Sequence, residues 1–155
     1  MHCHLTRAPA LVIAVVALSW VLLGSPRLAR AGGCLPTDSV PVLCGVIGSS
    51  TSRPLTIVRN WGCSADFFEG DQPCSGSSQP SPLAPNAFTL SSQDWDAFRV
   101  DRGCKYTWTV FDRVFDPITL AIGYVHEATG SLDRRDASTG QWVRVHTEQV
   151  VTITS

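Results

Sequence analysis

Apolar and polar residues alternate with a period of two along much of the chain, a pattern typical of β-strands. Lys105–Phe115 is the longest such run. Tyr106, Trp108 and Val110 fall on one of its faces, and large apolar residues also occupy the other face. We therefore expect this run to be an interior strand of a sandwich or barrel.

Shorter apolar or alternating runs predict the remaining strands. They cover residues 40–48, 54–61, 87–91, 97–100, 118–125, 142–146 and 149–154, with a further short strand around Phe67. Residues 126–140 are polar and predict turns. About seven or eight short strands at this spacing predict an all-β fold, an antiparallel Greek-key sandwich or barrel.

The segment at about 64–86 interrupts this regularity. Its second half, Ser75–Pro85, is rich in Ser, Pro and Gly, which predicts a flexible surface loop. A connection of this length is either functional or disordered. Cys74 limits how far we expect the loop to move.

The first 31 residues have the order of a secretory signal peptide. The apolar run Ala10–Leu23 follows a weakly basic start and precedes Ala29-Arg30-Ala31, a small-x-small cleavage site. As a helix the run reaches about 21 Å, short of the roughly 30 Å needed to cross a bilayer. We expect residues 1–31 to be removed, leaving 32–155 as one secreted β domain with no transmembrane anchor.

Charge excludes one class of partner. Loss of Arg7, Arg27 and Arg30 leaves 9 of the 12 basic residues against 13 acidic ones, a net charge of −4. A mildly acidic domain without a basic cluster is not expected to bind nucleic acid. Nearly all the basic residues that remain are arginines, a bias that we attribute to a GC-rich bacterial genome.

Cysteine usage agrees with an oxidising compartment. Five cysteines follow the signal: Cys34, Cys44, Cys63, Cys74 and Cys104. Spacing favours a Cys34–Cys44 disulfide, and Cys63 has either Cys74 or Cys104 as its partner. Because the number is odd, an alternative is a lipoprotein anchored through Cys34, since Ala31-Gly32-Gly33-Cys34 resembles a lipobox.

Three segments resemble the strands of small secreted microbial βγ-crystallin-like proteins, which contain two Greek keys. They are Arg53–Asn60, Trp95–Cys104 and Lys105–Asp112. The resemblance implies a Greek-key topology. It transfers no binding site, because the aromatic corner and the calcium signature of that family are not met: Cys63 stands where the corner has an aromatic residue.

The densest polar feature is Asp94-Trp95-Asp96, with Asp101 shortly after it. Asp94 and Asp96 point to the same side of an extended segment, so they are candidate ligands for Ca²⁺ together with Asp101. The alternative is that they are solvated turn residues. Trp95, and after it Trp142, are the tryptophans that we expect to be exposed and able to bind a ligand.

Other chemistry has weaker support. The pairs His126-Glu127 and His146-x-Glu148 do not have a diagnostic zinc spacing. Asp112 and Asp116 have the residue type of a glycosidase pair, but any β protein supplies such pairs. The known nucleophile and phosphate-loop motifs are absent from the sequence.

The sequence therefore predicts a secreted, non-enzymatic binding protein whose ligand is a protein or a cell-wall glycan. One alternative is an extracellular hydrolase inhibitor that displays Cys63–Cys74 or Ser75–Pro85. A third hypothesis is a small hydrolase that uses Asp112, Asp116 or His126. We expect no cofactor other than Ca²⁺.

Overall fold

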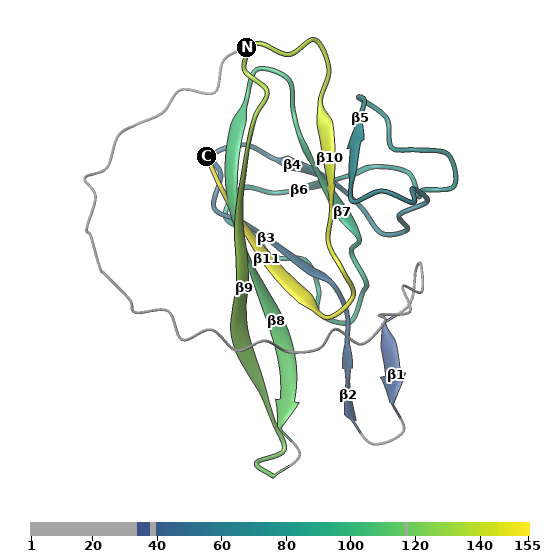
Figure 1. The fold of residues 1–155 in the computed structure, drawn as a ribbon, viewed down its shortest axis with the longest axis vertical. Coiled ribbons are helices and arrows are strands. Elements are labelled where there is room, and N and C mark those ends of the chain that lie inside the picture. Colours follow the sequence, from purple (N-terminus) through teal and green to yellow (C-terminus); the bar gives the residue numbers. More distant parts are fainter. Residues whose placement is uncertain (1–33, 38–39, 117) are drawn as a thin grey trace, which may run out of the picture.

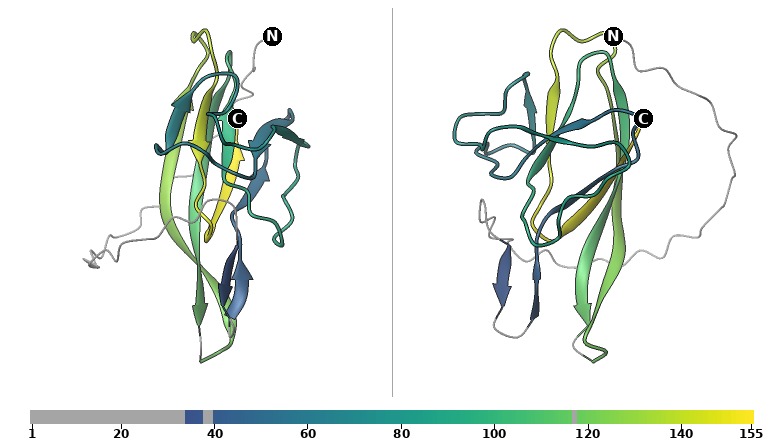
Figure 2. Two further views of the ribbon diagram at one scale, coloured as in Figure 1. Left: turned by 90° about the vertical axis from the view of Figure 1, so that its right-hand side faces the viewer. Right: turned by 180° about the vertical axis from the view of Figure 1, so that it is seen from behind.

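The computed structural model describes residues 34–37, 40–116 and 118–155, and within this part the chain forms strands and no helix. Nine strands form two sheets (Figures 1 and 2). Two more, β1 (Leu35–Thr37) and β2 (Val40–Leu43), form a small antiparallel pair. The all-β prediction is confirmed. The expected signal peptide, residues 1–31, lies outside the described residues.

The first sheet has five strands in the order β5-β10-β7-β4-β6, all antiparallel to their neighbours. Its strands are β4 (Leu55–Val58), β5 (Phe67–Glu69), β6 (Ser81–Leu83), β7 (Ala97–Val100) and β10 (Gln141–Arg144). Strand β7 is the central strand of this sheet. The segments before and after it therefore lie at opposite ends of the sheet, and both contain residues that are candidates for a site.

The second sheet has four strands in the order β3-β11-β8-β9. They are β3 (Val46–Ser49), β8 (Lys105–Asp116), β9 (Ala121–Asp133) and β11 (Gln149–Thr154). Strand β8 lies between β11 and β9, which confirms its interior position. One pair departs from the expected antiparallel order, because β3 runs parallel to β11. A parallel pair needs a long connection, and the rest of the domain supplies it.

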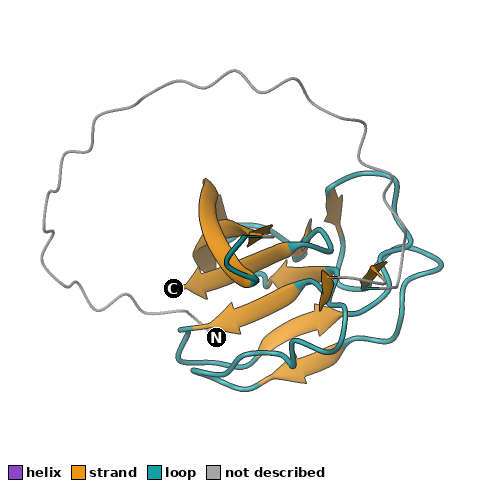
Figure 3. Cartoon of the chain, turned by 90° about the horizontal axis from the view of Figure 1, so that it is seen from below, coloured by secondary structure: helices purple, strands orange, loops and turns teal. Residues whose placement is uncertain are grey.

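The main core lies between the two sheets (Figure 3). Alternate residues of each strand point into it, as their periodicity requires. The rings of Phe98 and Trp108 meet edge to face across the core, with centroids 5.4 Å apart. The indole of Trp108 also occupies the space over Gly130, where a Cβ atom would lie 2.3 Å from the ring. Any larger residue at position 130 would displace the tryptophan.

A second, smaller core covers the outer face of the five-stranded sheet. It contains Val58, Trp61, Ala97 and Trp142, with Phe68 packed against them. The sequence pattern places Trp61 on the same face as Leu55 and Ile57, and this is wrong. Strand β4 ends at Val58, so the alternation stops before Trp61 and its ring packs against Trp142 instead, with centroids 6.4 Å apart.

Two disulfides hold the described chain. Cys34–Cys44 is confirmed, and Cys63 pairs with Cys74 rather than with Cys104. The Cys63–Cys74 bond closes the loop that covers the second core. Because Sγ of Cys34 forms a bond to Cys44, it is not available for the lipid linkage that the alternative requires. The two bonds indicate an oxidising environment.

The predicted strand boundaries agree with the structure where apolar and polar residues alternate, and they differ from it where this alternation is absent. Strands β5, β7 and β11 lie where predicted. Strand β9 continues to Asp133, through residues expected to be turns. Residues 87–91 form only an isolated bridge from Phe88 to Gly48. In the segment 64–86, the part expected as loop contains a further strand, β6. The Greek-key connection stays a prediction.

Candidate binding pocket

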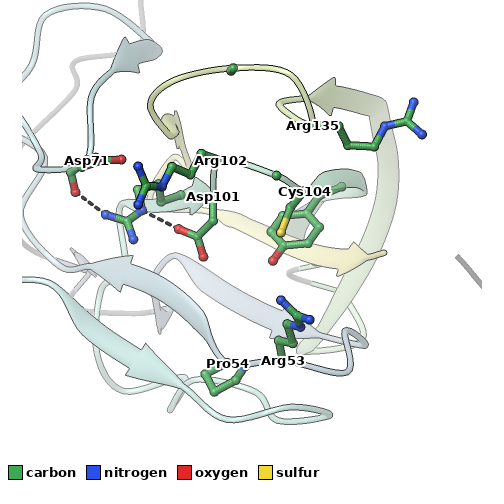
Figure 4. Close-up of a pocket in the computed structure, with 11 residues that line it drawn as sticks. Arg53, Pro54, Asp71, Asp101, Arg102, Cys104 and Arg135 are labelled. Atoms are coloured by element: carbon green, nitrogen blue, oxygen red, sulfur yellow. Dashed lines mark hydrogen bonds and ion pairs between the residues drawn. The ribbon is translucent and has the colours of Figure 1, made fainter. Parts of the chain in front are cut away.

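A hollow lies at the end of the sandwich where β7 turns into β8. It has a volume of about 1050 Å³ and three chain segments besides β7 and β8 contribute to its wall. Its residues are Arg53, Pro54, Asp71, Arg99, Asp101, Arg102, Gly103, Cys104, Tyr106, Arg135 and Ala137 (Figure 4). A hollow of this volume is at the upper end of the range for small-ligand sites.

Arg99 holds two walls of the pocket together. Its Nε donates to Oδ1 of Asp101 at 2.6 Å, and its Nη1 donates to the carbonyl oxygen of Asp71 (Figure 4). The guanidinium also lies 5.6 Å from the ring centroid of Trp142. Asp71 is fixed on its other side, because its Oδ1 accepts from the backbone N–H of Gly140 at 3.0 Å. Arg99 is therefore a positioning group whose donors are engaged.

The other arginines differ in their availability. Arg135 points away from the hollow in Figure 4 and forms an ion pair with Asp133, with Nη2 and Oδ2 2.5 Å apart. Arg102 is exposed, and no hydrogen bond or ion pair joins its side chain to the residues drawn in Figure 4. Arg53 lies across the pocket from Arg102, with Asp101 between them. Besides Arg135, Arg53 and Arg102 are thus the two exposed arginines of the lining, and Arg53 has a further interaction within the protein.

Tyr106 provides a neutral donor in the same place. Its side chain is only 2% exposed, yet the residue lines the pocket. Burial raises the pKa of its hydroxyl, and the Asp101 carboxylate adds to this rise, while Arg53 and Arg99 oppose it. The groups that influence the hydroxyl all line the pocket, so the hydroxyl end faces it.

The pocket is more positive than the protein as a whole. Four arginines and two aspartates line it, whereas the full chain has a net charge of −1. A concave surface lined by one sign of charge concentrates ions of the other sign. The two carboxylates make the lining mixed, so it offers acceptors for hydroxyl groups as well as donors for an anion.

The acidic stretch Asp94-Trp95-Asp96 lies at the other end of β7 and is buried. Asp94 is 7% exposed, and its carboxylate accepts from the backbone N–H of Gly45 at 2.5 Å and from the Thr147 hydroxyl at 3.2 Å. Asp96 is 5% exposed and accepts from the backbone N–H of Trp61 at 3.0 Å. The reading of these two residues as solvated turn acids is wrong, since both bond to the backbone of distant segments.

The two buried carboxyl groups are coupled. Burial, and after it the negative charge of Asp94, raise the pKa of Asp96 to about 7. The Asp96 side chain also has a hydrogen bond to that of Asp94, which favours the protonated form. Two carboxyl groups in one buried site cannot both ionise easily, so one of them keeps a proton. Through Gly45 and Trp61, this pair joins the start of β7 to the segment before β3 and the segment after β4.

The two tryptophans expected to be exposed are buried. Trp95 is 8% exposed and lies in the main core, and the Arg59 guanidinium covers its ring at 4.8 Å from the centroid. Trp142 is fully buried in the second core. The expectation fails because polar neighbours in the sequence were taken as a sign of exposure. Neither indole presents a face to a sugar.

The candidate calcium ligands are not assembled. Asp94 and Asp96 accept hydrogen bonds at one end of β7, and Asp101 pairs with Arg99 at the other. Among the described residues, no three His, Cys, Asp or Glu side chains are grouped as a metal site would need.

The remaining candidates are spread over the second sheet and a neighbouring loop. Asp112 and Asp116 are four residues apart on β8, about 13 Å at the usual strand rise. Glycosidase carboxyl groups lie about 5 to 9.5 Å apart, so this pair does not have that geometry. His126 on β9 packs against Phe111 on β8, and His146 lies 3.6 Å from a carboxylate oxygen of Asp66.

Sequence reasoning missed most of the pocket. Arg53, Arg99, Arg102 and Tyr106 come from separate segments, and only Asp101 was a candidate. The one available signal was the pattern Arg99-x-Asp101-Arg102 at a turn, since we attributed the abundance of arginine as a whole to genome composition. Nothing in the sequence indicates that Arg53 lies beside this turn.

Comparison of the chain with family models, with curated proteins and with solved structures gave no significant match. The resemblance to βγ-crystallin-like proteins therefore stays a prediction. In the part of the chain that the structure describes, no helix is long and apolar enough to span a membrane.

Proposed function

We propose that the protein is a secreted, non-enzymatic binding protein, and that its arginine-lined pocket takes an acidic sugar of a polar glycan. The observation that carries the proposal is the arginine-rich hollow, whose lining includes Tyr106, a buried residue with a hydroxyl group that can donate a hydrogen bond. A bound oxyanion would accept from it. Its raised pKa keeps the hydroxyl protonated and able to donate at neutral pH.

The mixed charge of the lining supports a sugar rather than a simple anion. A carboxylate on the ligand would lie beside the exposed guanidinium of Arg102, where charge-assisted hydrogen bonds are strong, and Arg53 is a second cation of the same hollow. The Asp71 and Asp101 carboxylates would accept from sugar hydroxyl groups and repel a highly charged phosphate. The volume of about 1050 Å³ is large enough for a sugar residue.

Calorimetric titration with digalacturonic acid tests this proposal. We expect binding by the wild type, and affinity about tenfold weaker for Tyr106→Phe, because a hydrogen bond to a charged group contributes about 1.5–3 kcal/mol. This variant removes one oxygen and keeps the ring that fills the core. Tyr124→Phe is the matched control, since Tyr124 lies on β9 away from the pocket, and its affinity should be unchanged.

Two further ligands distinguish binding of an acidic sugar from binding of any sugar or of any anion. Lactose, which is neutral, should not bind, and inorganic sulfate should bind more weakly than digalacturonic acid. No binding of digalacturonic acid, or equal binding to Tyr106→Phe and wild type, would show that the pocket does not hold an acidic sugar.

One observation favours the second candidate function, that of an extracellular hydrolase inhibitor. Phe67 is 53% exposed in the loop that the Cys63–Cys74 disulfide closes. A disulfide-closed loop is held in one conformation before it binds, which favours tight binding. A panel of proteases and amylases assayed with wild type and Phe67→Ala tests this function, and it fails if no enzyme is inhibited.

A further inference from the structure

The exposed apolar side chains gather on one part of the molecule. Eight large hydrophobic residues are exposed in the described chain, and five of them lie between residues 114 and 125. They are Val114, Ile118, Leu120, Tyr124 and Val125, with exposed fractions from 49% to 91%. Such a concentration marks an interaction surface rather than scattered surface residues.

These residues lie on a hairpin that projects from the sandwich. Strand β8 pairs with β11 only over Thr107–Asp112, whereas its pairing with β9 continues to Asp116. Beyond Asp112 the two strands form an arm, which extends past the sheets in Figures 1 and 2. We call residues 113–116 and 118–125 the β8–β9 arm. Two-stranded β structure is marginal in water when nothing covers it.

Strand β9 also forms an open edge of the sheet. It has 13 residues, and among the described strands only β8 pairs with it. Its sequence contains no Lys, Arg or Pro, the residues with which proteins usually protect a long edge. The other protective device, a bulge, occurs once, opposite Val110 and Phe111.

We propose that a second copy of this chain covers the arm, with the two β9 edges pairing antiparallel about a twofold axis. An edge strand offers the same donors and acceptors to its own copy, and this contact closes after two subunits. Residues 118–132 contain a single formal charge, that of Glu127, so two copies do not repel each other along most of the edge.

The size of the contact agrees with a weak dimer. Strand β9 is about 44 Å long at the usual rise, and a pairing strip about 10 Å thick along that length covers roughly 450 Å² on each subunit, at the low end for specific interfaces. A lipid bilayer is a poorer occupant. The outward N–H and C=O groups of the edge would have no partners in hydrocarbon.

Sedimentation equilibrium over about 1 to 200 µM tests the proposal, since interfaces of this size bind with a wide range of affinities. The wild type should move from monomer to dimer. Val125→Lys combined with Ser131→Lys places like charges on both faces of the edge and should remain monomeric. Phe67→Lys combined with Leu90→Lys makes the same change in charge at exposed positions off the arm and should dimerise as the wild type does.

Hydrogen exchange gives a readout that does not depend on a variant. The outward amides of β9 should become more protected in the wild type as its concentration rises. A wild type that stays monomeric, or a β9 variant that dimerises as well as the control, would overturn the proposal. So would a monomer whose β9 amides gain protection only on phosphatidylcholine vesicles, which would assign the arm to a membrane.

Discussion

Acidic residues lie at both ends of strand β7, but the fold buries them at one end and places them beside a pocket at the other. At one end, Asp94 and Asp96 are buried and accept hydrogen bonds from distant backbone groups. At the other end, Asp101 and Arg102 border an open pocket. The difference lies in what the fold brings against each end. A carboxylate becomes structural when backbone donors surround it, and it stays available for a ligand when side chains with exposed faces surround it.

The largest expected effect is on the pH dependence of stability. Asp96 has a pKa of about 7 in the folded protein against an ordinary 3.8, so between these values the folded state binds a proton that the unfolded chain releases. The free energy of unfolding should fall as pH rises from about 4 to about 7, by up to about 4 kcal/mol, and then level off. Urea unfolding at each pH measures this.

Other groups act outside that range. Hydrogen bonds lower the pKa values of Glu69, Asp116 and Asp133, so these carboxyl groups affect stability only below about pH 4.5. Asp96→Asn, which cannot titrate, should flatten the profile between pH 4 and 7. If the variant kept the full slope, the buried pair at this end of β7 would not hold a proton.

A smaller effect compares the two ends directly. Asp94→Ala leaves the Gly45 N–H and the Thr147 hydroxyl without their acceptor, and should lower the free energy of unfolding by about 3 kcal/mol. Asp101→Ala removes a partly exposed ion pair with Arg99 and should cost less than about 1 kcal/mol. Chemical denaturation at pH 7 gives both values. Equal losses would contradict the distinction between a structural end and an open end.

The smallest effect concerns ligand affinity at the open end. Arg102→Ala should weaken binding of digalacturonic acid about threefold, because an exposed charge contributes less than 1 kcal/mol in water. Arg135→Ala is its matched control, since Arg135 forms its ion pair outside the hollow. A loss of affinity for Arg135→Ala as large as that for Arg102→Ala would mean that the ligand responds to overall charge.

The sequence predicted the strands correctly where burial of one strand face produces an alternation of apolar and polar residues. Strands β7 and β11 face the core on one side, and their apolar residues alternate accordingly. Strand β9 is exposed on both faces from Tyr124 to Thr129, and after that only the side chain of Leu132 packs against the main core, so no hydrophobic pattern marks Glu127–Asp133 as strand. Strand β6 contains Pro82, which is tolerated because β6 is an edge strand that pairs with β4 alone.

The site was harder to predict than the fold. Asp94-Trp95-Asp96 looks like a ligand-binding motif in the sequence, but Gly45 and Trp61, which lie far from it in the chain, bury its carboxyl groups. Arg53 and Tyr106 form a pocket with Arg102 only after the sheets pack. Proximity of polar residues in sequence indicates a turn, whereas a binding site depends on long-range contacts that a single sequence does not reveal.

The most direct test of the central claim follows the arginine side chains by nuclear magnetic resonance during a titration with digalacturonic acid. The Nε–H signals of Arg53 and Arg102 should shift together and saturate at one dissociation constant, while that of Arg135 stays in place. Tyr106→Phe should require more ligand for the same shifts. Shifts that appear equally on all exposed arginines and never saturate would contradict a pocket built for an acidic sugar.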